Sequence, residues 1–588
     1  MVDMTITFNN LVKSFNGRII FENISGKIND GDRIGIIGIN GVGKTTLVKI
    51  LTGKEEVDEG KISYSHDRLT FGYLTQFAEF SEKTTVYEEL FKSGIEDINS
   101  SCNVDKYIRR VRKILLDMGF TEKTMNKETC KLSGGEKTKL SICKVILEDP
   151  DVLFLDEPTN HLDMESIKCL EEFLNSIKKT IVVISHDREF LDNTVNKIFE
   201  MNKNEIREYS GNYSKYKLQK ENERKNQQRE YDKQEREIRH LKEVINDRKT
   251  WYASAHRAAG QNDFLRSKAK KHAKVMKAKE RQLERLENNK VKRPSVDILA
   301  AFDCINKVKQ EDRRLPEYII KVNNINKSFG NRVLLKNASF NIKIGDKAAL
   351  MGGNGIGKTT LIKMLLGKEC IDSGEVYINP SLKIAYFSQE LEELNYSNSI
   401  LDEMLTTGAS VQAARLLLGC LLFRGEDVFK KIEVLSMGEK CRAAFGKLIL
   451  SGADMLILDE PTNYMDIISR EKIEEVIEKY EGTILFVSHD RYFIKRTSNR
   501  ILEIENSGVS SYEGNYEYYL KQKEELRNQK NKINYVNIRD EIRRLECEIA
   551  FISGKLDDSK ISYEEREELN NRFLQTAKQI NEFKRIIS

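Results

Sequence analysis

Short apolar runs separated by longer polar segments are the first pattern visible along the chain. The runs Val152–Leu155, Ile181–Ile184 and Ile484–Val487 contain no polar residue, which is typical of parallel strands that are buried on both faces. Helical stretches separate such runs. The pattern therefore predicts an α/β fold with helices packed around parallel sheets.

Two stretches near the middle of the chain have helical periodicity instead. Apolar residues recur there three, four or seven positions apart: Tyr231, Ile238, Leu241 and Ile245 within Leu218–Thr250, and Ala269, Ala273, Met276, Leu283 and Leu286 further on. These stripes predict two helices that pair as an antiparallel coiled-coil hairpin, with its turn near Trp251–Asp263. The first helix would be ~50 Å long.

The C-terminal segment from Lys521 has a similar pattern. Ile538, Ile542, Leu545, Ile549, Ile552 and Leu556 follow a four-three spacing, and a polar turn at Gly554–Lys560 separates them from Leu569, Phe573, Ile580 and Ile587. A second hairpin is therefore predicted. Its net charge of +2 leaves two alternatives open: contact with the RNA or protein of a binding partner, and packing within the chain.

Four segments occur twice, in the same order. Val12–Ser25 returns as Asn326–Ser339, Gly38–Leu47 as Gly352–Leu361, Leu153–Asp163 as Leu456–Asp466, and Val183–Phe190 as Phe486–Phe493; the last two pairs are both offset by 303 residues. Such a repeat predicts two homologous domains, here called cassette one (1–215) and cassette two (296–517). A basic helical linker (216–295) joins them, and a coiled-coil extension (518–588) follows.

Each cassette contains a glycine-rich loop that satisfies G-x-x-x-x-G-K-[ST], between an apolar strand and a helical run. The glycines of such a loop allow backbone N–H groups to surround phosphate oxygens, and the lysine reaches the β- and γ-phosphates. The residues expected to bind ATP are Gly38, Asn40, Gly41, Gly43, Lys44, Thr45 and Thr46 in cassette one, and Gly352, Asn354, Gly355, Gly357, Lys358, Thr359 and Thr360 in cassette two. Thr45 and Thr359 are expected to ligate Mg²⁺.

A pair of acidic residues ends a later apolar run in each cassette. Asp156 and Asp459 have the position of the aspartates that organise Mg²⁺ next to ATP. Glu157 and Glu460 follow directly and are the candidate catalytic residues, because a carboxylate there can orient or deprotonate the attacking water. The alternative, a structural acid at a strand end, is weakened by its presence in both copies.

LSGGEK at Leu132–Lys137 and LSMGEK at Leu435–Lys440 complete a constellation that resembles the ABC ATPase superfamily. The resemblance implies two tandem ABC-type P-loop nucleotide-binding domains joined by an α-helical coiled-coil hairpin linker, with a C-terminal helical hairpin. It implies a monomer whose cassettes pack head to tail, with two composite ATP sites. Lys44 would then work with Ser436 and Gly438, and Lys358 with Ser133 and Gly135.

The same resemblance assigns further residues to the ATP sites. Gln76 and Gln389 match the glutamine that contacts both ATP and Mg²⁺, His186 and His489 match the catalytic switch histidine, and Phe15 and Phe329 match the aromatic residue that stacks on adenine. For the two phenylalanines a place in the hydrophobic core is the alternative. Met437 replaces a signature glycine, and Tyr464–Met465 replaces His161–Leu162, so the two sites are expected to differ in rate.

Composition excludes several classes of protein. The nine cysteines form no CxxC motif, so reduced thiols are expected instead of a zinc or iron–sulfur site. No apolar run approaches the ~20 residues of a membrane span, and the N-terminus lacks a signal-peptide pattern, which predicts a cytoplasmic protein without a membrane partner. Leu218–Arg293 contains 23 Lys and Arg against 12 Asp and Glu, which indicates a polyanionic partner.

Fused cassettes, a charged helical linker and PTN(H/Y)xD loops resemble the ABC-F family. That resemblance implies a partner, the 70S ribosome, whose exit-tRNA site the hairpin enters to reach rRNA and peptidyl-tRNA. The residues expected to bind RNA are Trp251, Tyr252, His256, Arg257, Arg266, Lys268, Lys270, Lys271 and Lys274. A solvated charged face is the alternative reading of this basic run.

The segment after Phe264 further resembles the linker of ABC-F proteins that protect Gram-positive ribosomes from large-subunit antibiotics. Housekeeping translational-throttle members have an added arm in cassette one, but Gln76 and Leu132 enclose 55 residues against 45 between Gln389 and Leu435, which leaves no room for a long arm. A resistance factor is the leading hypothesis. A housekeeping factor that relieves stalled ribosomes and a DNA-binding ATPase are alternatives, and a transporter motor is the least favoured.

Overall fold

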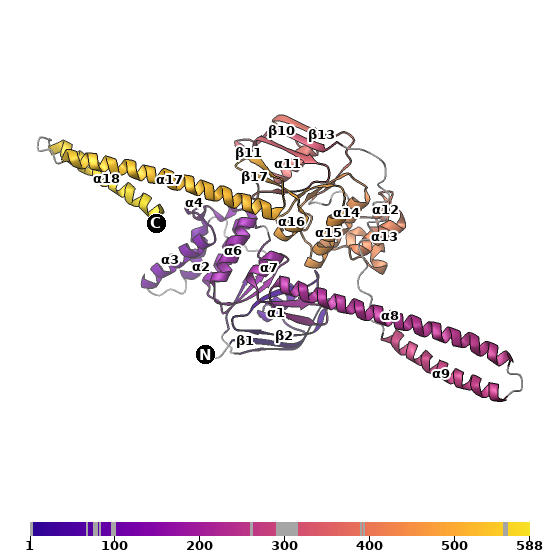
Figure 1. Cartoon of the computed structure of the whole chain (residues 1–588). Helices are drawn as coiled ribbons and strands as arrows, with labels where there is room; N and C mark the ends of the chain where they lie inside the picture. Colours follow the sequence, from indigo (N-terminus) through magenta and orange to yellow (C-terminus); the bar gives the residue numbers. More distant parts are fainter. Residues whose placement is uncertain are drawn as a thin grey trace. The chain divides into compact units, whose positions relative to one another are not determined.

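The computed structural model describes residues 4–65, 69–74, 80, 84–95, 101–160, 162–258, 263–289, 316–388, 391, 394–556 and 563–587. The chain forms two compact units. One consists of Met1–Thr497 with Glu503–Val509, and the other of Ser498–Leu502 with Ser510–Ser588. The first unit contains both glycine-rich loops and the basic linker (Figure 1).

Cassette one contains two sheets. The three-stranded antiparallel sheet has the order β2 (Arg18–Asn29), β1 (Thr5–Phe15) and β4 (Glu59–Tyr64). The six-stranded sheet has the order β5 (Phe71–Leu74), β6 (Val152–Asp156), β7 (Thr180–Ile184), β3 (Arg33–Ile37), β8 (Lys197–Met201) and β9 (Ile206–Ser210). Its strands are parallel from β5 to β8, and all residues of β6 and β7 are buried. Two predicted strands are thereby confirmed.

Cassette two repeats this arrangement. Its antiparallel sheet has the order β11 (Arg332–Lys343), β10 (Tyr318–Phe329) and β13 (Ser373–Ile378). Strands β14 (Ile384–Phe387), β15 (Met455–Asp459), β16 (Thr483–Val487) and β12 (Lys347–Met351) are adjacent and parallel in that order. Strands β17 (Arg500–Glu505) and β18 (Gly508–Tyr512) follow in the chain. The strand predicted at Ile484–Val487 is β16, again fully buried.

Helices follow the strands in both cassettes. Cassette one has α1 (Lys44–Leu51), α2 (Val86–Ile95), α3 (Ser101–Asp117), α4 (Glu122–Met125), α5 (Gly134–Leu147), α6 (Met164–Ser176) and α7 (Arg188–Thr194). Cassette two has α11 (Lys358–Leu365), α12 (Ile400–Leu405), α13 (Val411–Cys420), α14 (Met437–Leu450), α15 (Ile467–Lys479) and α16 (Arg491–Thr497). Short 3₁₀ turns at Thr129–Lys131, Gly425–Phe429 and Ile432–Val434 precede α5 and α14.

Two helices of cassette one are longer than their counterparts within the described residues: α2 has 10 residues, whereas α12 has 6. Helix α3 has 17 residues, whereas α13 has 10. Val111, Leu115 and Met118 are fully buried against the helices around them. The additional residues therefore enlarge the helical layer of cassette one.

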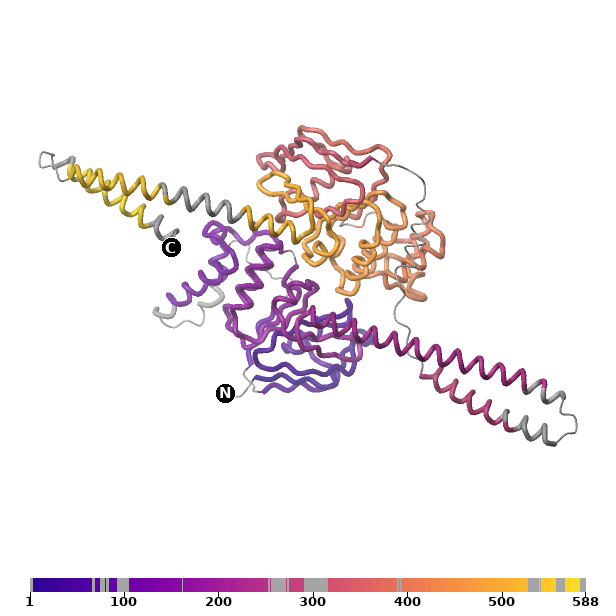
Figure 2. The backbone as a smooth tube through the Cα atoms, viewed as in Figure 1, coloured from indigo at the N-terminus to yellow at the C-terminus, as the bar shows by residue number. Residues whose placement is uncertain are grey.

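The linker forms the predicted helical hairpin (Figure 1). Helix α8 (Tyr213–Ala258) and helix α9 (Asp263–Asn288) lie side by side, and Ile238, Leu241 and Ile245 are buried along α8. Ion pairs cross between the helices, including Lys242–Glu287 at 2.7 Å. Figure 2 shows α8 leaving cassette one and α9 running back alongside it.

The position of the hairpin turn differs from the prediction. Trp251–Ala258 was expected in the turn but belongs to α8, and residues 259–262 lie outside the described residues. The reason is local composition: this segment contains several alanines and no glycine or proline before Gly260, and alanine has the highest helix propensity. Helix α8 is consequently 46 residues long.

The C-terminal extension is a second helical hairpin, formed by α17 (Tyr516–Leu556) and α18 (Tyr563–Ile587). Ile542, Leu545 and Ile580 form its buried apolar cluster, and an ion pair of 2.7 Å joins Arg572 to Glu548 across the helices. The predicted hairpin is confirmed, except that Gly554 lies in α17 rather than in the turn. None of the helices among the described residues is long and apolar enough to cross a lipid bilayer.

Candidate functional site

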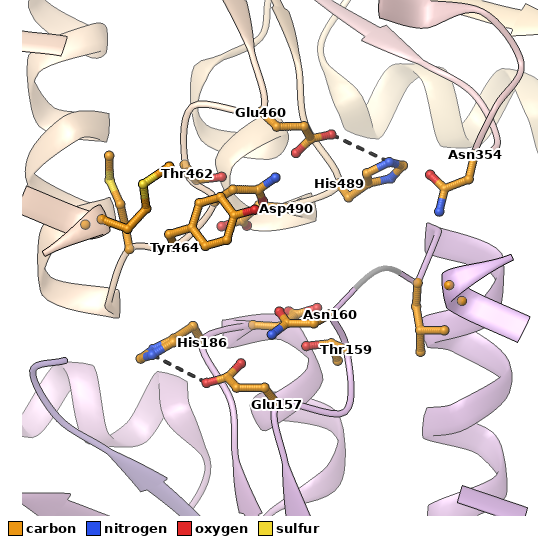
Figure 3. A pocket seen from close by; sticks show the side chains of 18 of the residues that line it. Glu157, Thr159, Asn160, His186, Asn354, Glu460, Thr462, Tyr464, His489 and Asp490 are labelled. Carbon is orange, nitrogen blue, oxygen red and sulfur yellow. Dashed lines mark ion pairs between the residues drawn. The ribbon is translucent and has the colours of Figure 1, made fainter. Parts of the chain in front are cut away.

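One pocket of about 1250 Å³ collects candidate residues from both cassettes (Figure 3). The predicted residues that line it are Asn40, Gly41, Gly43, Lys44, Thr45, Thr46, Ser133, Gly135, Asp156, Glu157 and His186 from cassette one, and Phe329, Asn354, Gly355, Gly357, Lys358, Thr359, Thr360, Ser436, Gly438, Asp459, Glu460 and His489 from cassette two. Gln76 and Gln389 lie outside the described residues. Motifs far apart in the sequence thus converge on one cavity.

The two glycine-rich loops have a backbone that requires glycine. Gly43 and Gly357 have φ angles of 97° and 111°, in the left-handed region. A Cβ atom on Gly43 would lie 2.7 Å from the Phe21 ring, so this position has no room for a side chain. Each loop leads into the N-terminus of a helix, α1 or α11, and such a turn-to-helix junction binds phosphate through its N–H groups.

The loop lysines are folded over their own loops. Lys44 Nζ donates to the carbonyl oxygen of Gly38 at 2.7 Å, and Lys358 Nζ donates to that of Gly352 at 2.8 Å. Burial lowers the pKa of both lysines. Two buried cations inside a cradle of backbone N–H groups fit an anionic ligand such as a triphosphate.

An oxygen-rich pair of side chains lies beside each lysine. The hydroxyl of Thr45 donates to Asp156 at the end of β6, and Thr359 donates to Asp459 at the end of β15. Burial raises the pKa of both aspartates. In the part of the chain that the structure describes, no three His, Cys, Asp or Glu residues are grouped to hold a metal ion. A hydroxyl and a carboxylate fit Mg²⁺, which is usually held jointly with substrate phosphates.

Each cassette also presents a glutamate–histidine pair to the pocket. His186 Nε2 lies 3.4 Å from Glu157 Oε1, and His489 Nε2 lies 3.5 Å from Glu460 Oε1 (Figure 3). Both glutamates have a φ of 50°, a left-handed conformation that costs energy for a residue other than glycine and is frequent at functional sites. The backbone therefore holds these carboxylates in one direction.

Burial sets the protonation of these pairs. It raises the pKa of Glu157 and of Glu460 to about 7, because the charged carboxylate loses water. It lowers the pKa of His489 to about 4 and that of His186 well below its usual value. The imidazoles are therefore neutral near pH 7. Because Nε2 of His186 also lies 3.1 Å from Asn40 Oδ1, the Nε2–H tautomer suits its surroundings.

The P-loop of cassette one directly contacts cassette two. The backbone N–H of Asn40 donates to Asp466 Oδ2 at 3.2 Å, and Asn40 Nδ2 donates to the carbonyl oxygen of Tyr464 at 3.0 Å. A Cβ atom on Gly438 would lie 2.9 Å from that same carbonyl oxygen. The structure therefore brings Lys44 together with the LSMGEK segment of the other cassette.

The serines of LSGGEK and LSMGEK, Ser133 and Ser436, are the N-caps of two helices, and both serines line the pocket. Ser436 caps α14 by accepting from the Glu439 N–H, and the Glu439 side chain accepts in return from the Ser436 N–H. Ser133 and Glu136 form the same capping box at α5. The remaining N–H groups of each helix terminus can bind an anion.

Buried ion pairs join the cassettes next to the pocket. Arg188 of α7 forms an ion pair with Glu474 of α15, and its guanidinium lies 3.2 Å from Asp490. The equivalent Arg491 of α16 forms an ion pair with Glu171 of α6. Sequence reasoning missed these pairs. The available signal was an arginine directly after the histidine–aspartate dipeptide in both copies.

The two candidate adenine-stacking residues are exposed. Phe15 is 44% exposed and Phe329 is 51% exposed, so the alternative that they belong to the hydrophobic core is excluded. A lysine ammonium lies over each ring, Lys13 at 5.0 Å and Lys327 at 4.8 Å. Phe329 lines the pocket, whereas Phe15 is not among its lining residues.

The first turn of α8 is packed against both cassettes. Tyr213 is buried in a cluster with Leu191 of cassette one and Ile467 of cassette two. Its hydroxyl donates to Glu471 Oε1 at 3.1 Å, and Lys217 forms an ion pair of 3.1 Å with the same carboxylate. The N-terminal end of α8 therefore contacts α15, the helix that also contains Glu474.

Three of the candidate RNA-binding side chains are described, and all are exposed: Trp251, Lys271 and Lys274. The backbones of the other six belong to α8 or α9, but their side chains lie outside the described part; they are Tyr252, His256, Arg257, Arg266, Lys268 and Lys270.

Comparison with known proteins gives consistent matches along the chain. A family model described as ABC transporter matches residues 21–160 and 335–463, and a further model with the same description matches residues 199–299. The chain is 35% identical to the putative ATP-binding protein YdiF of Bacillus subtilis, over 96% of this chain and 88% of that protein. It is 32% identical to ABC transporter F family member 5 of Arabidopsis thaliana, over 88% and 77%.

Two further relatives have names that refer to translation. The chain is 33% identical to the ribosome protection protein VmlR of Bacillus subtilis, over 98% of both chains. It is 30% identical to the energy-dependent translational throttle protein EttA of Escherichia coli, over 85% of this chain and 92% of that protein. Among solved structures, an archaeal ribosome recycling factor matches with a TM-score of 0.56 and 20% identity, over 85% and 89%, which supports the fold alone.

We expect Arg188→Met to weaken the docking of the cassettes, because it removes the guanidinium that cassette one supplies to the buried Glu474. Breaking a buried ion pair costs about 3–5 kcal/mol, and the cost should lie at the lower end because Arg496 still pairs with Glu474 at 3.3 Å. The ATP concentration that half-closes the cassettes should therefore rise about 100-fold. Fluorescence resonance energy transfer between dyes on the two cassettes measures closure during an ATP titration.

Lys472→Met is the matched control for this measurement. Its 2.7 Å ion pair with Glu475 lies on the same helix, within cassette two, and its removal should leave the titration unchanged. If Arg188→Met closes at the same ATP concentration as this control, the ion pair does not hold the cassettes together.

Proposed function

Because this chain belongs to the ABC-F family, we propose that it is an ATPase that binds the bacterial 70S ribosome when ATP closes its cassettes. Hydrolysis then opens the cassettes and releases the protein. The α8–α9 hairpin enters the exit-tRNA site and acts on the peptidyl-transferase centre. The observation that carries the proposal is the shared pocket, where the Asn40 loop of cassette one contacts Tyr464 and Asp466 of cassette two.

Two composite ATP sites account for the residues of this pocket. Lys44 binds the β- and γ-phosphates of one ATP, while Ser436 and Gly438 bind its γ-phosphate from the opposite cassette. Lys358 binds the second ATP, opposite Ser133 and Gly135. Since each ATP would touch both cassettes, binding stabilises the closed form by the affinity gained across the interface.

Thr45 and Asp156, with Thr359 and Asp459 at the second site, are the residues that would hold Mg²⁺, together with the predicted but undescribed Gln76 and Gln389. The ion would neutralise charge on the β- and γ-phosphates.

The glutamates perform the hydrolytic step. Glu157 or Glu460 accepts a proton from a water molecule as the water oxygen forms a bond to the γ-phosphorus, and the bond from that phosphorus to the bridging oxygen breaks. The products are ADP and inorganic phosphate. Neutral His186 or His489 donates its Nε2–H toward the reacting oxygens and keeps the glutamate in place.

The basic hairpin supports a ribosomal partner. Its stretch Leu218–Arg293 has 11 more basic than acidic residues, and Trp251, Lys271 and Lys274 are exposed along it. Lysine and arginine side chains bind RNA phosphates, and an exposed tryptophan stacks on an unpaired base. The names of VmlR and EttA, which refer to ribosome protection and translation, point in the same direction.

The finer proposal is protection of the ribosome from antibiotics that act on the large subunit, favoured by similarity to VmlR over 98% of both chains. Similarity to EttA favours a second candidate, a housekeeping factor that relieves stalled ribosomes. Deletion and re-expression of the gene in its own bacterium separate them. Sensitivity confined to large-subunit drugs supports resistance, whereas a general growth defect without drug supports the housekeeping role.

We expect Glu157→Gln/Glu460→Gln to bind ATP without hydrolysing it, and therefore to remain on 70S ribosomes. Loss of the general base should lower the ATPase rate about 100-fold or more. In sedimentation with ATP the variant should pellet with ribosomes, and chemical footprinting should show protection near the exit-tRNA site and the peptidyl-transferase centre.

The control adds Lys44→Ala and Lys358→Ala to that variant, which removes the phosphate-binding lysines. This protein should stay in the supernatant with or without ATP. If the glutamine variant also fails to pellet with ATP, the ribosomal part of the proposal is wrong.

We expect the ATPase rate, measured without ribosomes, to rise as the pH increases through about 7 and then to level off. The proton acceptor must be ionised, and burial raises the pKa of Glu157 and Glu460 to about 7. The histidines contribute no inflection there, because burial lowers their pKa values. ATP affinity of the glutamine variant over the same range is the control. A rate that is constant or falls across this range would contradict the assignment.

A further inference from the structure

Arg470 occupies a position where the two cassettes differ. It belongs to α15, four residues after Asp466, and the repeat offset of 303 residues places Ile167 at the equivalent point of α6. Both residues line the pocket. Ile167 is buried in the apolar core of cassette one, whereas the guanidinium of Arg470 makes polar contacts. The repeat therefore provides a single guanidinium, whose charge acts on both Glu157 and Glu460 but whose hydrogen bond across the interface goes to His186.

The contacts of Arg470 join three segments. Its Nε donates to the carbonyl oxygen of Met465 at 3.0 Å, within the loop before α15. Its Nη1 donates to the carbonyl oxygen of His186 at 3.1 Å, across the interface, and lies 3.4 Å from Asp490 Oδ2. Asp490 also forms an ion pair with Arg188. One side chain thus connects the switch-histidine loop of cassette one to the loop before α15 and to Asp490, which follows His489 in cassette two.

Other departures from the repeat lie at the same site. Met437 and Tyr464 belong to the segments of cassette two that face the Lys44 loop, and the Tyr464 carbonyl accepts from Asn40. Arg470 is therefore part of a set of differences that are concentrated around Lys44 and Glu157. The site around Lys358 and Glu460 faces the cassette one segment that carries Ile167.

We propose that Arg470 is a positioning residue for only one of the two ATP sites. By holding the carbonyl oxygen of His186, it keeps the His186 imidazole against Glu157 only while cassette two is docked. Hydrolysis at the Lys44 site is thereby conditional on closure through a direct tether, which the Lys358 site lacks at the equivalent position. This inference deepens the proposed ATPase activity and rests on it.

The test measures each site separately. In Glu460→Gln the Lys44 site is the one that hydrolyses ATP, and in Glu157→Gln it is the Lys358 site. Adding Arg470→Ile, the residue found in the other cassette, should lower kcat about 10-fold or more in the Glu460→Gln protein, with KM nearly unchanged. It should leave kcat of the Glu157→Gln protein within about 2-fold, since the interface ion pairs remain. Lys472→Met on the same helix is the control and should change neither.

Hydrogen–deuterium exchange gives a second readout that needs no hydrolysis. In Glu157→Gln/Glu460→Gln with ATP, Arg470→Ile should speed exchange of amides at 185–188 more than at 488–491, because Asp490 keeps its ion pair with Arg188 whereas the carbonyl oxygen of His186 loses the hydrogen bond from Arg470. Equal loss of kcat at both sites, or an equal increase in exchange at both loops, would show a general interface role and overturn the proposal, as would no effect at either.

The parent variants distinguish the two proposals. If the protein with both glutamates intact does not hydrolyse ATP, the proposed ATPase function is wrong; if it does but neither Glu460→Gln nor Glu157→Gln does, the two sites hydrolyse only together. The difference in amide exchange between residues 185–188 and 488–491 then tests the hydrogen bond from Arg470 to His186 without any need for hydrolysis.

Discussion

The reciprocal ion pairs buried between the cassettes are the constraint on which the rest of the structure depends. Arg188 meets Glu474, and Arg491 meets Glu171, at positions related by the internal repeat. A buried charge without its partner costs several kcal/mol, so each cassette is complete only when the other is docked in one register. That register determines which P-loop meets which signature, and it creates the pocket from residues that neither cassette could supply alone.

The features that could be predicted from sequence are those with a local physical cause. Strands such as β6 and β7 are recognisable because every side chain is apolar, and the loop at Gly38–Thr45 is recognisable because only glycine tolerates its backbone. Duplication of each motif strengthened the assignment of Glu157 and Glu460. The linker hairpin was predicted from two apolar stripes, and Ile238, Leu241 and Ile245 of the first stripe are buried along α8.

The features that were missed depend on contacts between distant segments. Arg188 and Glu474 are 286 residues apart, and no periodicity along either helix marks them as partners. Arg470 is similar, because its three acceptors come from two cassettes. The end of α8 was misplaced for another reason: the turn was predicted to begin near Trp251, whereas the alanines that follow continue the helix to Ala258.

The rigid attachment of α8 has a mechanical consequence. Tyr213 and Lys217 hold its first turns to Glu471, and its 46 residues give a straight rod ~70 Å long. A rod of that length displaces its far end by ~1.2 Å for each degree that its base rotates. A tilt of ~10° at the base would therefore move the tip by ~12 Å, so a small rotation where α8 contacts α15 becomes a large displacement at the far end of the helix.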